Sequence, residues 1–211
     1  FGKGFGYRGD YLGEICFNTS VTGYQEILTD PSYYKQIINF TFPHIGIVGS
    51  NKFDTESSKI YASACIINNQ LTPSSNFRSE QDLEKWLYTN KKACITGIDT
   101  RFITKFIRDS GACNGLIHFP KRKFRQISYL KDLLKSFPSM NNLDLASEIS
   151  TKKIFKWENN KKNILDFNKL KGKFVAVFDF GIKNNILNIL SKSKYQVIVF
   201  PYNFCLEKIL K

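Results

Sequence analysis

The sequence predicts an α/β protein, and three observations lead to this class. The first 75 residues contain short β-branched or apolar runs separated by Gly, Pro and Asn clusters, which is typical of strands joined by turns. From residue 79 onward, runs with helical spacing alternate with short apolar runs. Towards the C-terminal end, an apolar strand, a helix and a second apolar strand form a β-α-β unit, which favours a parallel sheet.

The elements of the first 150 residues follow from apolar periodicity. Leu83, Trp86 and Leu87 recur at i, i+3 and i+4, which predicts a helix. A second helix begins at a cap provided by Asp99 or Thr100 and ends at Gly111. A third helix is expected over 128–137, and strands are expected over 11–17, 36–42, 62–67, 93–98 and 115–119.

The C-terminal part divides into a polar stretch and an apolar one. Residues 151–172 are predicted to be an exposed linker, because Lys and Asn dominate there and apolar periodicity is weak. Beyond it, buried strands are expected over 173–180 and 195–200, with a helix between them. A β-α-β unit of about 40 residues is too small to hold a core alone. The sequence therefore predicts a domain over 1–150, a linker over 151–172 and a truncated second domain over 173–211.

The formal charge of +13 raises nucleic-acid binding as a hypothesis. Most of the excess is Lys, however, whereas bidentate phosphate recognition favours Arg. Lys, Ile, Phe and Asn also share A/T-rich codons, so nucleotide bias in the gene explains the same composition. The basic segment Lys121–Arg125 is interpreted as a solvated loop. We expect no nucleic-acid partner, and no membrane partner either, because no apolar run approaches the roughly 18 residues of a membrane span.

Two glycine motifs lack the context that their chemistry needs. Gly4–Gly9 has G-x-G-x-x-G spacing, but no strand is expected before it and no helix after it, so turns between strands are preferred to a dinucleotide loop. Gly111–Gly115 has the spacing of a nucleophile elbow around Cys113, but a helix precedes it and a strand follows. The elbow needs the reverse order, so this segment is interpreted as a helix-ending turn.

The metal-binding residue types are few and scattered. The five cysteines contain no C-x-x-C pair, and His44 and His118 are the two histidines, so no metal site is expected. Both histidines lie among apolar residues beside a proline and are interpreted as structural. The odd number of cysteines indicates reduced thiols in a reducing compartment.

Several longer motifs resemble one family. Residues 14–49, EICFNTSVTGYQEILTDPSYYKQIINFTFPHIGIVG, are similar to the signature region of the glutamine-hydrolysing small subunit of carbamoyl-phosphate synthase. SNFR (Ser75–Arg78), GIDTR (Gly97–Arg101), the SGACNG turn and DFGIKNNIL (Asp179–Leu187) resemble that family in the same order. The resemblance covers nearly the whole chain.

The resemblance implies a fold and an activity. The fold is a layered β/α N-terminal domain, followed by the start of a flavodoxin-like parallel α/β domain of the class I glutamine amidotransferases. In that family a cysteine thiolate, activated by a His–Glu pair, attacks the side-chain amide of L-glutamine and releases ammonia. Ammonia passes to a large subunit that uses bicarbonate, ATP and Mg to form carbamoyl phosphate for arginine and pyrimidine biosynthesis.

Little of that machinery is expected in these 211 residues. The serine of TDPSY belongs to the family's glutamine site, and its match is Ser32; a hydroxyl bonded to its own turn backbone is the alternative. The nucleophilic Cys and the His and Glu are expected beyond Lys211, so no catalytic residue is assigned. The chain is expected to bind no cofactor, to hydrolyse no glutamine alone, and to be an internal fragment.

Two function classes therefore stay open. The first is the enzyme subunit, in a heterodimer or higher assembly with the synthase large subunit. The second is a non-catalytic interaction module that docks on such a large subunit without chemistry. The expected compartment is the cytoplasm, or alternatively the plastid stroma or another organelle with an A/T-rich genome.

Overall fold

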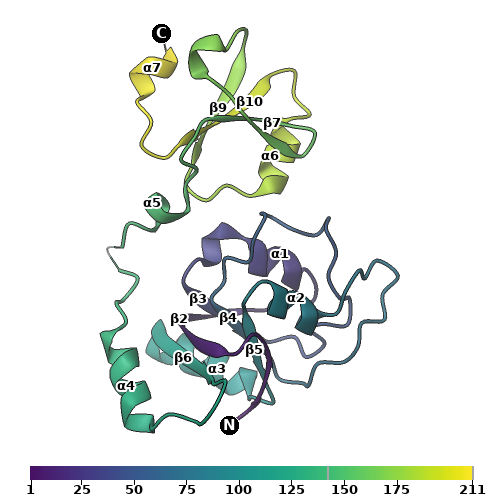
Figure 1. Ribbon diagram of the computed structural model, residues 1–211, viewed down its shortest axis with the longest axis vertical. Coiled ribbons are helices and arrows are strands. Elements are labelled where there is room, and N and C mark those ends of the chain that lie inside the picture. Colours follow the sequence, from purple (N-terminus) through teal and green to yellow (C-terminus); the bar gives the residue numbers. More distant parts are fainter. Residues whose placement is uncertain (142, 211) are drawn as a thin grey trace. The chain divides into compact units, whose positions relative to one another are not determined.

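The computed structural model describes residues 1–141 and 143–210, which leaves Asn142 and Lys211, the last residue of the predicted second domain, outside the description. The chain divides into two compact units, unit 1 over 1–143 and unit 2 over 144–211. Each unit has its own sheet with helices, which confirms the α/β class (Figure 1). Within the described residues, no helix combines the length and apolar character needed to cross a membrane.

Unit 1 is built on a six-stranded sheet in the order β1-β5-β4-β3-β2-β6. The strands are β1 (Lys3–Gly6), β2 (Gly9–Asn18), β3 (Gln36–Phe40), β4 (Ala64–Ile66), β5 (Ala93–Thr96) and β6 (Cys113–Phe119). The four central strands run parallel, whereas β1 and β6 pair antiparallel at the two edges. The five strands predicted for this part of the sequence are all present.

The glycine-rich N-terminus is itself part of the sheet. Gly4–Gly9 spans β1, a tight turn and the start of β2, and no helix follows it, so its spacing serves strand geometry. Gly6 has φ 82°, and a Cβ there would lie 2.4 Å from the carbonyl oxygen of Lys92. Only glycine fits this close approach to the neighbouring strand.

The helices of unit 1 cover both faces of the sheet. They are α1 (Tyr24–Thr29), the short 3-10 helix η1 (Pro31–Tyr33), α2 (Leu83–Thr89), α3 (Thr100–Ser110) and α4 (Ile127–Ser136). The cap of α3 is Asp99, whose carboxylate accepts the N–H of Phe102 at 2.9 Å, and Gly111 ends the helix as predicted. Helices α1 and η1 fall in the part of the sequence that was predicted to be mainly β.

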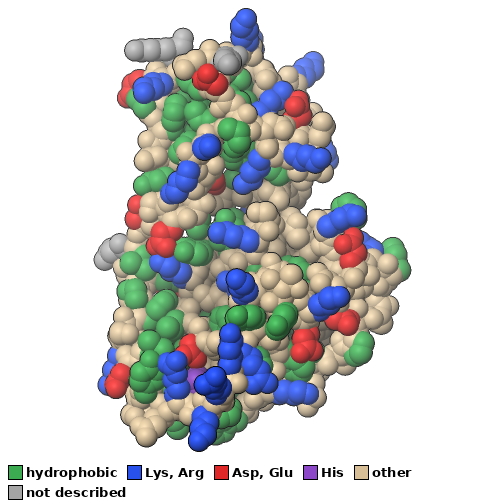
Figure 2. Space-filling model, in the orientation of Figure 1, with side chains coloured by type: hydrophobic (Ala, Val, Ile, Leu, Met, Phe, Trp, Pro, Cys, Tyr) green, Lys and Arg blue, Asp and Glu red, His purple; other side chains and the backbone are tan. Residues whose placement is uncertain are grey.

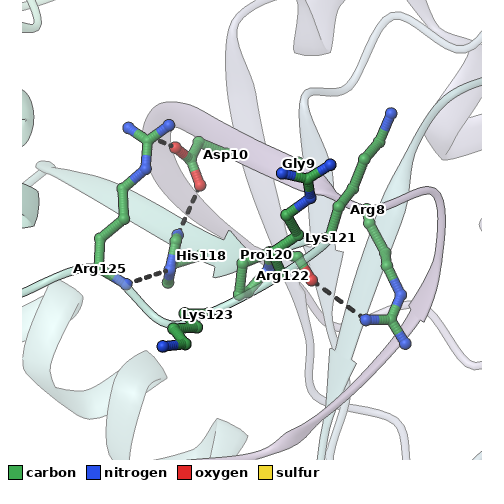
Figure 3. A pocket seen from close by; sticks show the side chains of 9 residues that line it. All are labelled: Arg8, Gly9, Asp10, His118, Pro120, Lys121, Arg122, Lys123 and Arg125. Carbon is green, nitrogen blue, oxygen red and sulfur yellow. Dashed lines mark hydrogen bonds and ion pairs between the residues drawn. The ribbon is translucent and has the colours of Figure 1, made fainter.

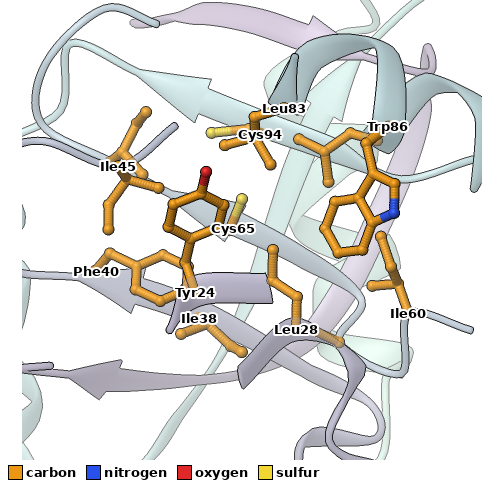
Figure 4. Packing of buried hydrophobic residues seen from close by; sticks show 13 residues of the cluster. Tyr24, Leu28, Ile38, Phe40, Ile45, Ile60, Cys65, Leu83, Trp86 and Cys94 are labelled. Atoms are coloured by element: carbon orange, nitrogen blue, oxygen red, sulfur yellow. The ribbon is translucent and has the colours of Figure 1, made fainter. Parts of the chain in front are cut away.

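The core of unit 1 follows from side-chain alternation along β3. Ile38 and Phe40 face the larger buried cluster, where α1 contributes Leu28 and α2 contributes Leu83 (Figure 4). Ile37 points to the opposite face and joins a smaller cluster beneath α3. Each such fully buried aliphatic or aromatic side chain stabilises the fold by about 1.5–3 kcal/mol.

Unit 2 is built on a four-stranded sheet in the order β8-β7-β10-β9. Its elements are α5 (Leu145–Ile149), β7 (Phe155–Glu158), β8 (Lys161–Ile164), η2 (Phe167–Lys169), β9 (Phe174–Asp179), α6 (Asn184–Leu190), β10 (Gln196–Pro201) and α7 (Leu206–Leu210). β9 and β10 pair in parallel with α6 between them, which confirms the predicted β-α-β unit.

The prediction of an exposed linker over 151–172 is wrong. Strands β7 and β8 lie in this segment, and β7 pairs antiparallel with β10. Phe155 and Trp157 are buried in the core of unit 2 on the same face as Leu187 of α6. The strands therefore belong to the second sheet, and unit 2 begins at Asp144.

Candidate functional site

Ser32 lies in η1, the turn between α1 and β3. The buried carboxylate of Asp30 accepts the backbone N–H of Ser32 at 2.9 Å, and Pro31 restricts the backbone at the start of the turn. The Ser32 residue itself is exposed. The turn thus fixes the backbone through Asp30 and presents the hydroxyl group at the surface, where it can donate or accept a hydrogen bond.

The neighbouring tyrosine ties this turn to the end of β2. Asn18 donates from Nδ2 to the Tyr33 hydroxyl at 3.1 Å, and its Oδ1 accepts the N–H of Ser20 at 2.9 Å. The carbonyl oxygen of Asn18 also accepts the N–H of Thr41, which follows β3. One asparagine therefore joins the turn, the end of β2 and the end of β3.

Buried polar side chains hold α1, which precedes the turn. Thr29 donates its hydroxyl to the carbonyl oxygen of Gln25 at 2.9 Å and accepts the N–H of Glu56 at 2.9 Å. Gln25 donates to the carbonyl oxygen of Asn51 and accepts the N–H of the same residue at 3.0 Å. Fully paired buried groups of this kind fix a single local structure. The polar residues of the sequence VTGYQEILTDPSY thus provide a rigid base for Ser32.

Three cysteines of unit 1 are poor nucleophiles. Burial, with a smaller contribution from the Glu14 carboxylate, raises the pKa of Cys16 to about 11, and the same two causes raise the pKa of Cys113. Burial also raises the pKa of Cys94, which lies beside Cys65 in the sheet. A thiol is a nucleophile only as thiolate, so the raised pKa values lower the fraction of the reactive form at neutral pH. Cys113 begins β6 after α3, in the helix-then-strand order that excludes a nucleophile elbow.

The two histidines occupy different environments. The side chain of His118, in β6, is 8% exposed and is hydrogen-bonded on both ring nitrogens, as expected of a structural histidine. His44 is exposed and packs edge-on against the ring of Phe42, with 5.6 Å between ring centroids. Across the described parts of the chain, no group of three or more His, Cys, Asp or Glu side chains could hold a metal ion.

Unit 2 contains a second candidate position, which sequence reasoning did not assign. Asp179, buried at the carboxyl end of β9, accepts the N–H groups of Gly181 and Ile182 at 3.0 Å each and that of Thr151 at 2.7 Å. These bonds shape the loop between β9 and α6. Ligands in α/β proteins bind at the carboxyl ends of parallel strands, so this loop lies at the ligand-binding edge. The available signal was an aspartate that directly follows an apolar run; the prediction that this run is a buried strand is wrong, because β9 lies at the edge of the described sheet and its apolar residues are partly exposed.

Comparison with known proteins gives one consistent answer. The family profile described as "Carbamoyl-phosphate synthase small chain, CPSase domain" matches residues 1–117. The chain is 43% identical over 206 residues to the carbamoyl phosphate synthase small chain of Buchnera aphidicola subsp. Acyrthosiphon pisum, covering 95% of this chain and 53% of the relative. It is 38% identical over 217 residues to the small chain of Zymomonas mobilis, covering 100% and 57%. It is 39% identical over 216 residues to that of Salmonella typhimurium, covering 100% and 56%. The chain thus spans about half the length of these relatives.

Proposed function

Because the chain belongs to the carbamoyl-phosphate synthase small-chain family, we propose that it forms part of the glutamine-hydrolysing subunit of such a synthase. The observation that carries this proposal is the family match over residues 1–117, which includes Ser32 and the rigid turn that presents it. The alignments with the small chains of Zymomonas mobilis and Salmonella typhimurium cover the full length of this chain.

In the proposed reaction, the whole protein hydrolyses the side-chain amide of L-glutamine and delivers ammonia to a large subunit. The large subunit uses ATP and Mg to combine ammonia with bicarbonate, and the product serves arginine and pyrimidine biosynthesis. This chain binds none of the ATP or Mg. The proposed compartment is the cytoplasm, where thiols stay reduced.

We assign Ser32 to glutamine binding. Its exposed hydroxyl can form a hydrogen bond with an amide or carboxylate group of a small polar ligand. Asp30 and Pro31 hold the backbone in place before the ligand arrives, which lowers the entropic cost of binding. No catalytic step is assigned to Ser32, and the raised thiol pKa values of Cys16, Cys94 and Cys113 support placing the nucleophile elsewhere in the protein.

The test is co-purification of the full gene product with a synthase large subunit, followed by an assay of glutamine-dependent carbamoyl phosphate formation. We expect a stable complex that forms carbamoyl phosphate from glutamine, bicarbonate and ATP. A complex that forms but uses only ammonia would contradict the proposal and favour a non-catalytic docking module.

A further inference from the structure

A basic pocket lies on unit 1 where β2 begins and β6 ends. It encloses about 380 Å³ between these strands and the loop that follows β6. The side chains that matter at its rim are five cations and one carboxylate: Arg8, Lys121, Arg122, Lys123, Arg125 and Asp10 (Figure 3). In the space-filling view, Lys and Arg side chains gather over the part of unit 1 where Figure 1 shows β6 (Figure 2).

The floor of the pocket is a hydrogen-bonded network with a defined proton position. The backbone N–H of Arg125 donates to Nε2 of His118 at 3.2 Å, so this nitrogen carries no proton. Nδ1 of His118 therefore holds the ring proton and donates it to the carboxylate of Asp10 at 2.6 Å. Asp10 and His118 are direct partners in the β2–β6 pairing. The network joins the loop to the sheet through the ring of His118.

The one carboxylate at the rim is already neutralised. The second oxygen of Asp10 lies 3.4 Å from a guanidinium nitrogen of Arg125, so this ion pair cancels two of the six charges. The remaining cations of the pocket are Arg8, Lys121, Arg122 and Lys123. Among the ion pairs of the described residues, none of these four has a carboxylate partner. The pocket therefore carries an excess of four positive charges.

Neutral contacts hold two of these cations in place. Arg8 donates to the carbonyl oxygen of Pro120 at 3.1 Å, and its guanidinium lies 5.0 Å from the ring centre of Phe119. The ammonium of Lys121 lies 3.3 Å from the Tyr7 hydroxyl and 5.0 Å from the centre of the same ring. These contacts order the side chains without removing their charge, so the site is positioned before a ligand arrives.

We propose that this pocket binds a small molecule that carries two or more negative charges on phosphate groups. Arg and Lys side chains are the usual ligands of phosphate oxygens, and four like charges in one concave site repel each other until an anion binds. A volume of about 380 Å³ is in the range of small-molecule sites. A half-open pocket of this size, with its cations on one short loop and the adjoining strand, fits a compact anion better than an extended strand of nucleic acid.

The test is calorimetric titration of the chain with inorganic pyrophosphate at low and at physiological ionic strength. We expect measurable binding that weakens as salt increases. The double variant Arg122→Gln/Lys123→Gln removes two exposed pocket cations and should raise the Kd about tenfold or more. Arg101→Gln/Lys105→Gln removes the same two residue types from exposed positions of α3 and should change the Kd less than about twofold. Fluorescence in the Trp157→Phe background, which leaves the buried Trp86 of unit 1, verifies that both variants fold.

Three outcomes would overturn the proposal. The first is no pyrophosphate binding at low ionic strength, and the second is an equal loss of affinity in the two double variants, which would indicate general surface charge. The third is an RNA oligonucleotide that binds more tightly than pyrophosphate through Arg122 and Lys123, which would assign the surface to nucleic acid. Titration with ADP separates the two sources of the phosphate groups, because a nucleotide site binds ADP more tightly than pyrophosphate and a site for inorganic phosphates does the reverse.

Discussion

Units 1 and 2 differ in how the two faces of their sheets are covered. In unit 1, helices α1 and α2 cover one face of the sheet and α3 covers the other, with aliphatic side chains such as Ile37 and Ile38 on both faces. In unit 2, α6 covers one face, and the other face is covered by aromatic rings around the fully buried Phe200. Phe167 and Phe204 pack at 5.6 and 5.0 Å from this ring.

The comparison shows how a small unit obtains a core. Unit 2 spans residues 144–211, a length at which one hydrophobic core gives a few kcal/mol at most. Large aromatic side chains bury much area for each residue ordered, so they compensate for the short helices. Phe180, Ile189 and Leu210 nevertheless remain mostly exposed in unit 2. We therefore expect unit 2 to be the less stable of the two.

The largest effect is expected from truncating one central ring in each unit. Phe40→Ala in unit 1 and Phe200→Ala in unit 2 should each cost about 3–5 kcal/mol of unfolding free energy, because both side chains are fully buried. In unit 2 this loss is comparable to the whole unfolding free energy of the unit, so Phe200→Ala should unfold unit 2 without denaturant. Urea titration measures the unfolding free energy of both variants.

The chain has two tryptophans, which makes the readout specific for each unit. Trp86 is buried in unit 1 and Trp157 in unit 2. In the Trp157→Phe background the fluorescence reports unit 1, and in the Trp86→Phe background it reports unit 2. Equal shifts of both signals in the Phe200→Ala variant would contradict separate cores.

The next largest effect is expected at Asp179. Replacing it by Ala leaves three backbone N–H groups without their charged acceptor and should cost unit 2 about 2–3 kcal/mol. Asp166→Ala is the matched control, because its exposed carboxylate accepts one N–H group, that of Asn168, and should cost about 1 kcal/mol or less. The Trp157 fluorescence measures the unfolding free energy of unit 2. Equal losses in the two variants would show that the buried hydrogen bonds of Asp179 stabilise unit 2 no more than the exposed one of Asp166.

A smaller effect is expected from the helix caps. Asp99 caps α3 in unit 1, whereas the cap position of α6 in unit 2 is Lys183, which forms no side-chain cap bond. Asp99→Ala should therefore cost about 1 kcal/mol in the Trp86 signal. Asp109→Ala near the end of the same helix is the control, and it should leave the urea midpoint unchanged. A midpoint shift as large as that of Asp99→Ala would exclude the capping explanation.

The smallest perturbation is thiol labelling of the unsubstituted chain, which compares a cysteine of unit 1 with a cysteine of unit 2. Burial raises the pKa of Cys16 to about 11, so about one molecule in a thousand is thiolate at pH 8. Its alkylation rate should rise about tenfold per pH unit until pH approaches 11. Cys205 of unit 2 is exposed and should be labelled first. Mass spectrometry of the labelled peptides measures the order, and faster labelling of Cys16 would contradict the packing described for β2.

The sequence was most informative where apolar periodicity was strong. The helix around Trp86, the helix ended by Gly111 and the parallel β-α-β unit all appear where they were predicted. The β7–β8 hairpin was missed because Lys and Asn outnumber apolar residues in that segment. The signal was nevertheless present, since Phe155 and Trp157 alternate with polar residues at the period of a strand.

Turn chemistry also marked the missed hairpin. Asn159 and Asn160 both have positive φ, at 52° and 58°, which is the conformation of a two-residue turn between antiparallel strands. Ser32 could be found from the sequence only through a family motif. The exposure of its hydroxyl depends on the folded turn, in which the backbone N–H of Ser32 donates to the Asp30 carboxylate. The basic pocket could not be found, since the β2–β6 pairing that joins Arg8 to Lys121–Arg125 brings together residues far apart in the chain.

The most direct test of the proposed role of Ser32 compares two nitrogen sources in the assembled synthase. Ser32→Ala should lower carbamoyl phosphate formation from glutamine at least about tenfold at subsaturating glutamine, because a hydrogen bond to the ligand is lost. Formation from ammonia should not change. Ser58→Ala, at another exposed serine of unit 1, should leave both activities unchanged. Unchanged glutamine-dependent activity in Ser32→Ala would contradict the assignment of this hydroxyl to the glutamine site.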